Sequence, residues 1–170
     1  MPTNGTVRVQ STTILREHHA ARGAPIRDNY YLNFTSIIIK GYMVQGIDPK
    51  LFWPPSPGSN GFVLHTSSSQ IVLPASTYDA FRVVVVNLVK VLYGLDSVEP
   101  LAGYDMCFNT TDLAAVANVT PFFMPSMALV FEGGMAHLKL LDGVLFQEVP
   151  DFDERYYSCM LVVAGDECGG

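Results

Sequence analysis

One short segment of the chain combines a histidine with a run of hydroxyl side chains: His65, Thr66, Ser67, Ser68 and Ser69 follow one another. A histidine beside a serine can activate a nucleophilic hydroxyl, because the imidazole accepts the serine proton. That chemistry also needs an acidic residue to orient the histidine, and the segment has no such residue and no Gly-x-Ser-x-Gly turn. The segment is therefore predicted to be a hydroxyl-rich turn rather than a serine-nucleophile site.

Side chains that bind metals are present elsewhere, but their spacing is unfavourable. Glu17, His18 and His19 are adjacent, and neighbours on a strand point to opposite faces, so a solvated strand end is favoured over a metal site. The acidic segment 151–154 lacks the spaced oxygens and the glycine of a calcium-binding loop, which favours an acidic surface turn. We therefore expect neither a metal ion nor a cofactor.

Cysteines and glycosylation sequons indicate the compartment. The three cysteines, Cys107, Cys159 and Cys168, match no zinc spacing and allow at most one disulfide within the chain. Sequons begin at Asn4, Asn33, Asn109 and Asn118. Four sequons among seven asparagines exceed the chance expectation of about one in eight, which predicts passage through the secretory pathway. Residues 1–11 lack the apolar stretch of a signal peptide, so the chain is interpreted as a fragment.

The composition limits the possible partners. The 170 residues are 49% hydrophobic and 15% charged, which fits one folded domain and excludes a disordered chain. The net charge of −6 argues against binding to nucleic acid and to anionic membranes, both of which require clustered basic residues. The most apolar window, residues 81–95, is interrupted by Arg82, Asn87 and Lys90 and is too short to span a bilayer.

The first half of the chain is predicted to be rich in strands. Residues 30–44 combine aromatic and β-branched side chains, with a turn at Gly41. Residues 62–64 and 71–73 are two short apolar strands, joined by the hydroxyl-rich segment that follows Leu64.

A helix is predicted over residues 76–93, where the apolar period changes to about 3.6. Ser76 and Asp79 resemble a capping box at its start, and Gly94 marks its end. The expected apolar face consists of Phe81, Val84, Leu88, Val91, Leu92 and Leu95. The four consecutive valines at 83–86 have poor helix propensity, so this helix must be stabilised by tertiary burial.

The second half of the chain is again predicted to be strands. Residues 128–131 and 136–141 form a hairpin around the turn Glu132-Gly133-Gly134, and His137 lies in its second strand. Residues 156–163 are predicted to be one last strand.

Several short blocks occur in an order that is typical of one protein family. The blocks are Tyr30-Tyr31-Leu32-Asn33-Phe34, Gly61-Phe62-Val63-Leu64, Leu73-Pro74-Ala75-Ser76-Thr77-Tyr78-Asp79-Ala80, Tyr104-Asp105-Met106-Cys107-Phe108, Pro125-Ser126-Met127 and Phe131-Glu132-Gly133-Gly134. Over residues 7–163 the ordered set resembles the carboxy-terminal lobe of plant pepsin-like aspartic proteases of the nepenthesin type, and of the related plant xylanase inhibitors. The resemblance implies that residues 1–170 form a single, mainly β lobe with one prominent helix.

The resemblance also assigns a role to the segment at residue 65. Relatives cleave peptide bonds with two aspartates, one from each lobe, which share a proton so that the ionised one activates water. Each aspartate lies in an Asp-Thr/Ser-Gly-Thr/Ser turn, and the corresponding turn here is His65, Thr66, Ser67 and Ser68. His65 replaces the aspartate and Ser67 replaces the glycine, so we expect no catalytic residue in this lobe.

Relatives also have features that bear on the ends of the lobe. By resemblance, Cys107 and Cys159 form a disulfide, which leaves Cys168 unpaired or bridged to another chain. The amino-terminal lobe is absent, and so, by this interpretation, are the apolar glycine-containing strand and the further strands that follow the Cys159 strand in relatives. The chain is therefore interpreted as an incomplete lobe, whether a truncated gene product, an incomplete gene model or a dedicated single-lobe protein.

Two functions are compatible with this sequence. The first is a secreted, non-catalytic lobe that binds a protein or peptide ligand in the manner of an inhibitor. The second is a fragment of an aspartic endopeptidase that acts only together with an amino-terminal lobe. The histidine at position 65 favours the first.

Overall fold

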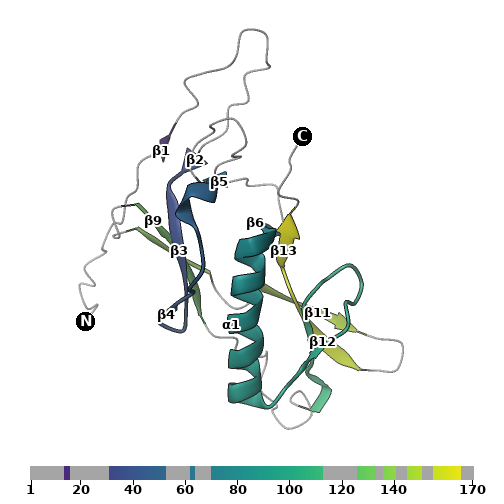
Figure 1. Cartoon of the computed structure of the whole chain (residues 1–170). Coiled ribbons are helices and arrows are strands. Elements are labelled where there is room, and N and C mark those ends of the chain that lie inside the picture. Colours follow the sequence, from purple (N-terminus) through teal and green to yellow (C-terminus); the bar gives the residue numbers. More distant parts are fainter. Residues whose placement is uncertain are drawn as a thin grey trace, which may run out of the picture.

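The computed structural model of the chain describes residues 14–15, 31–52, 62–63, 70–112, 126–132, 136–140, 145–150 and 155–165. Strands dominate this part of the chain and surround one long helix, α1 (Ala75–Tyr93), as predicted (Figure 1). The strands are β1 (Ile14–Leu15), β2 (Tyr31–Leu32), β3 (Phe34–Ile39), β4 (Tyr42–Met43), β5 (Phe62–Val63), β6 (Ile71–Pro74), β7 (Ser97–Val98), β8 (Cys107–Asn109), β9 (Met127–Phe131), β10 (His137–Leu140), β11 (Phe146–Pro150), β12 (Tyr156–Met160) and β13 (Val162–Gly165). A short 3-10 helix, η1 (Pro49–Phe52), follows β4.

The described strands form four small open sheets. Three are antiparallel, with the strand orders β1-β2-β5, β10-β9-β3-β4 and β11-β12-β8-β7. The fourth is the parallel pair β13-β6, which lies beside the start of α1 (Figure 1). The helix packs on this parallel pair, and Val85 of its valine run also faces Ile39 of β3 and Met127 of β9, so several sheets supply the tertiary burial that the run requires.

The strand pairings of the two predicted hairpins are confirmed, although Gly133 and Gly134 of the second turn lie outside the described residues. β3 and β4 are joined through Lys40 and Gly41, which both have positive φ (49° and 85°), the conformation that tight hairpin turns need. β9 and β10 form the second predicted hairpin, in which His137 lies opposite Val130.

The predicted bounds of the helix are nearly correct, but the predicted cap is wrong. The helix begins at Ala75, the N-cap is Pro74, and no side chain caps it. β6 leads into the helix without a connecting residue, so Ser76 already lies inside the first turn and cannot act as the flanking cap residue.

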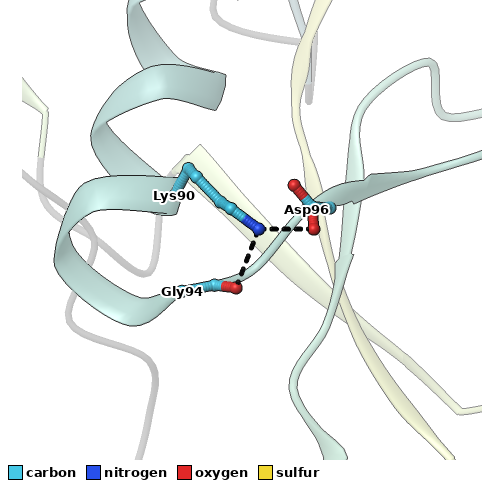
Figure 2. A network of polar contacts seen from close by, with 3 residues as sticks. All are labelled: Lys90, Gly94 and Asp96. Atoms are coloured by element: carbon cyan, nitrogen blue, oxygen red, sulfur yellow. Dashed lines mark hydrogen bonds and ion pairs between the residues drawn. The ribbon is translucent and has the colours of Figure 1, made fainter.

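At its carboxy-terminal end the helix stops where the sequence predicted. Gly94 adopts the left-handed conformation (φ 72°), and its N–H donates to the carbonyl of Lys90 at 2.9 Å. The Lys90 ammonium donates to the Gly94 carbonyl at 3.4 Å and pairs with Asp96 at 2.6 Å (Figure 2). The positive charge of Lys90 interacts favourably with the partial negative charge at the carboxy-terminal end of the helix. Its ion pair with Asp96 is exposed and contributes only about 0–1 kcal/mol.

The buried face of the helix differs from the predicted one. Its buried apolar residues are Tyr78, Phe81, Val85 and Val89. Val91, which was predicted to be buried, is 81% exposed, and Leu92 is also exposed. The helix carries apolar residues on more than one side, and its packing against the surrounding strands determines which of them are buried.

The main core contains a cluster of four phenylalanines beside β3. Phe34 stacks on Phe62 with ring centroids 5.2 Å apart and contacts Phe52 at 4.5 Å. Phe131 packs edge-on against Phe62 at 5.5 Å. These contacts hold β5 and η1 against the sheet formed by β3 and β9.

The predicted last strand is in fact two strands that belong to different sheets. β12 pairs with β8 and β11, the chain bends at Leu161, and β13 then runs parallel to β6. β13 is apolar and extends to Gly165, two residues beyond the predicted end of the last strand. A Cβ on Gly165 would lie 2.5 Å from Cγ1 of Val72, which explains why glycine is required there.

Candidate functional site

The segment predicted to replace the catalytic turn connects two sheets. His65, Thr66, Ser67 and Ser68 themselves lie outside the described residues. Before them, β5 pairs antiparallel with β2, and after them β6 pairs parallel with β13. β5 and β6 both lie near the end at which α1 begins (Figure 1).

Both strands that flank this segment are anchored in the core. Phe62 of β5 belongs to the phenylalanine cluster, and Leu73 of β6 is almost completely buried. α1 then begins directly after β6. The core therefore anchors β5 before the segment and β6 after it.

The framing strands supply no acid. None of β2, β5, β6 and β13 contains an aspartate or glutamate, and the whole sequence has no acidic residue between Asp48 and Asp79. Close carboxylates are what allow an aspartic protease to hold one shared proton and activate water. This stretch of the chain cannot contribute a carboxylate to such a pair.

The described residues contain no metal-binding group. No three histidine, cysteine, aspartate or glutamate side chains in the described ranges are close enough to hold an ion. The sequence segments 17–19 and 151–154, weighed above as ligands, lie outside these ranges. No helix in the described part is long and apolar enough to span a membrane.

The predicted disulfide between Cys107 and Cys159 is present. The two residues lie directly opposite each other on β8 and β12, with their Cα atoms 4.0 Å apart, and both are fully buried. With Tyr157 they form a second, smaller core. Around it pack the partly buried residues Val98, Leu101, Tyr104 and Val149. Cys168 lies outside the described residues.

A buried tyrosine on α1 was not singled out by the sequence analysis. Tyr78 is 5% exposed, and its hydroxyl has no hydrogen-bond partner in the described part of the chain. Burial raises the pKa of Tyr78, with a further contribution from the negative charge of Asp105. The phenol is therefore held neutral and acts as a packing group. In the sequence it is one aromatic residue in an apolar helix, which gives no signal of an unpartnered hydroxyl.

A small cavity lies between α1 and the neighbouring sheets. Its volume is about 10 Å³, which is too small for an organic ligand. Its walls are apolar and are formed by Ile39, Phe81, Val85, Met127, Leu145, Phe146 and Met160. The cavity is a packing defect and not a binding site.

Two of the four sequons lie in described residues, and their environments differ. The carboxamide of Asn33 donates to the carboxylate of Glu132, a partner 99 residues away that the sequence analysis did not connect with it. The Asn109 Oδ1 atom accepts a hydrogen bond of 3.1 Å from the backbone N–H of Thr111. Asn4 and Asn118 lie outside the described residues.

Comparison with known proteins supports the fold. A search of curated proteins gave no match. Among solved structures, the chain is similar to a protein named EDGP (TM-score 0.70, 21% identity), to basic 7S globulin from soybean (0.62, 20%) and to conglutin gamma from lupine seeds (0.61, 15%). The alignments cover 91%, 91% and 92% of this chain but 37%, 35% and 32% of those proteins. The chain thus spans about a third of the length of each.

A family model provides the assignment. The model described as "Xylanase inhibitor C-terminal" matches residues 29–169, most of the chain. The match includes the helix, the two disulfide-bonded strands and the segment that begins at His65. The chain therefore belongs to the xylanase inhibitor C-terminal family, whose structural neighbours here have the lobe fold that the ordered sequence blocks predicted.

Proposed function

We propose that this chain is a non-catalytic lobe of the pepsin-like fold that binds a protein or peptide ligand. The observation that carries the proposal is the absence of any acidic residue between Asp48 and Asp79, the stretch that contains the turn at His65. The family assignment supports it, because the family is named for inhibitors and not for enzymes.

The replacement of aspartate by histidine at position 65 removes the carboxylate that the shared-proton mechanism of aspartic proteases requires. Two close carboxylates resist ionising together, and the shared proton that results is what allows one to act as base. An imidazole at this position accepts a proton but cannot share one with a carboxylate in that way. Ser67 stands where the family turn has glycine, and glycine adopts backbone conformations that a residue with a Cβ disfavours, so we expect the family turn to be disfavoured as well.

A second candidate is a role as part of an aspartic endopeptidase. The observation that favours it is that the chain spans about a third of each structural neighbour, so a longer protein would place this lobe beside an amino-terminal lobe. In that assembly the amino-terminal lobe is the partner and would supply one aspartate.

We also propose that the chain acts in the secretory pathway or outside the cell. The buried disulfide between Cys107 and Cys159 supports this, since disulfides persist in oxidising compartments. The four sequons support it independently.

A proteolysis assay tests the absence of activity. Two samples are compared: the purified chain alone, and the chain mixed with a separately made amino-terminal lobe that carries its own catalytic aspartate. Each is incubated with a denatured protein substrate at about pH 3 to 5, where a carboxylate pair shares its proton. We expect no pepstatin-sensitive cleavage. A matched variant that combines His65→Asp with Ser67→Gly rebuilds the family turn and serves as the positive control in the mixture. Cleavage by the mixture that contains the unaltered chain would refute the proposal and favour the endopeptidase.

A binding assay tests the positive part of the proposal. Because the family is named for xylanase inhibitors, secreted xylanases are the first ligands to examine. Each xylanase is titrated into a solution of the chain, and binding is measured by isothermal titration calorimetry. We expect saturable binding. If the ligand contacts the segment that corresponds to the family's catalytic turn, as we propose, replacing residues 65–68 by glycine should weaken it. The matched control carries substitutions at Val91 and Asp96, which are exposed at the carboxy-terminal end of the helix.

A further inference from the structure

The sequence makes its four sequons equivalent, but the structure separates the two that it describes. We infer that Asn109, and not Asn33, carries an N-linked oligosaccharide in the folded protein. The inference builds on the proposed secretory route, and it assigns the modification to one position.

The carboxamide of Asn33 is part of the contact between β3 and β9. Its Nδ2 atom donates to Oε2 of Glu132, and its backbone carbonyl accepts the N–H of the same residue at 2.7 Å. Its Oδ1 atom is buried and has no hydrogen-bond partner among the described residues. The flanking residues Leu32 and Phe34 are both buried in the core, so the backbone at Asn33 has little room to move.

The third residue of this sequon is also engaged. The hydroxyl of Thr35 donates to the carbonyl of Val130 at 3.1 Å, across the same pair of strands. Both polar side chains of the sequon therefore serve the pairing of β3 with β9. An N-linked oligosaccharide is bulky and hydrated and must project into solvent. A sugar chain on the Nδ2 atom of Asn33 would replace its hydrogen bond to the exposed Glu132 carboxylate, which would have to move aside.

Asn109 is placed differently. Its Oδ1 atom accepts the N–H of Thr111 at 3.1 Å, so the carboxamide is held by its oxygen, and its Nδ2 atom donates no hydrogen bond within the described part of the chain. The Thr111 hydroxyl in turn accepts the N–H of Tyr156 at 3.0 Å, so the third residue is engaged in both sequons and the two sites differ at the Nδ2 atom of the asparagine.

The strand alternation directs Asn109 away from the main core. Phe108 belongs to the main core and Cys107 to the smaller one on the opposite face of the sheet. Since residues two apart on a strand share a face, Asn109 lies on the same face as Cys107. Asn109 is half-buried, as Asn33 also is, so exposure does not separate the two sites, but a sugar chain on Asn109 leaves on the face opposite the main core.

Site mapping on the full chain tests the inference directly. The chain is produced with a heterologous secretion signal in a glycosylating host, which makes occupancy independent of its natural route. Secreted, folded protein is treated with a peptide N-glycosidase in heavy-oxygen water, which converts each occupied asparagine to a labelled aspartate. We expect the label at position 109 and none at position 33. Label at position 33, or none at position 109, overturns the inference.

Two variants give a second readout that needs no peptide mapping. Asn33→Gln and Asn109→Gln each remove one acceptor and leave Asn4 and Asn118 in place. The glycosidase-sensitive mobility shift of Asn33→Gln should equal that of the unaltered chain, and Asn109→Gln should lose one step. The reverse pattern contradicts the inference. If either variant is not secreted, the label positions in the unaltered chain still decide between the two sites.

Discussion

Removing the buried disulfide should be the most damaging small change to this lobe. The bond joins residues that are 52 positions apart in the sequence, and for a loop of that length the chain-entropy model gives about 4 kcal/mol of stabilisation. A typical domain has about 5–15 kcal/mol in total, so the double variant Cys107→Ala with Cys159→Ala should lose a quarter to most of its stability.

The backbone pairing of β8 with β12 is too short to replace the stabilisation that the disulfide provides. β8 and β12 pair over three positions, and the cysteines occupy the last of them, fully buried in the smaller core. Alanine at both positions also removes two sulfur atoms from that core, which adds to the loss. The predicted decrease in the free energy of unfolding is therefore at least the entropic value of about 4 kcal/mol.

Equilibrium unfolding in urea, followed by circular dichroism, measures this decrease. The comparison uses the oxidised chain, the double variant and the control Cys168→Ser, which removes only the cysteine predicted to be unpaired. We expect the control to match the unaltered chain. A decrease of less than about 0.5 kcal/mol in the double variant, the range of an ordinary surface substitution, would refute the reasoning. So would an equally large loss in the control, because it would assign the stabilisation to a different cysteine.

Three further predictions concern single side chains. Tyr78→Phe removes a buried hydroxyl without a described partner, so the free energy of unfolding at neutral pH should stay equal or rise by up to about 1 kcal/mol. Burial raises the pKa of Tyr78 above its value in the unfolded chain, so alkaline pH ionises this phenol more easily in the unfolded chain than in the folded one. The unaltered protein therefore loses stability as the pH rises above about 10 and through the folded pKa of Tyr78. Tyr78→Phe lacks this group and should keep a higher melting temperature in that pH range. Gly165→Ala should cost about 1–3 kcal/mol in urea unfolding, and adding Val72→Ala should restore most of it, because the clash is with that side chain. Asn33→Asp replaces the donor to Glu132 by a second carboxylate at an exposed contact, so it should lower stability at pH 7 by about 0.5–1 kcal/mol, and the difference should shrink on acidification as one carboxyl group takes up a proton.

Elements with strong local patterns could be predicted from the sequence. The strand run at residues 30–44, the helix up to Gly94 and the hairpin around Glu132 each combine a clear period with a turn residue that permits positive φ. The disulfide followed from the family resemblance, since spacing alone left the pairing of three cysteines open.

Features that depend on distant contacts could not be predicted. The helix is apolar on several sides, and only its tertiary packing decides that Val85 is buried and Val91 is exposed. β7 and β8 have two and three residues, too few for an alternation to be recognised. The contact between Asn33 and Glu132 joins residues 99 positions apart and leaves no local pattern.

The bend at Leu161 has a consequence for how this chain tolerates insertions and deletions. The backbone of Leu161 donates to the carbonyl of Leu145 at 2.7 Å and accepts the N–H of Ile71 at 2.9 Å, so one residue ties together segments of two sheets. If one residue is inserted here, the pairing of β12 and the pairing of β13 with β6 cannot both keep their register. A shift of β13 by one residue would turn the buried side chain of Val162 outward. Single-residue insertions scanned along the chain should therefore be tolerated least between positions 160 and 162, even though a bend between strands is where length variation is ordinarily absorbed.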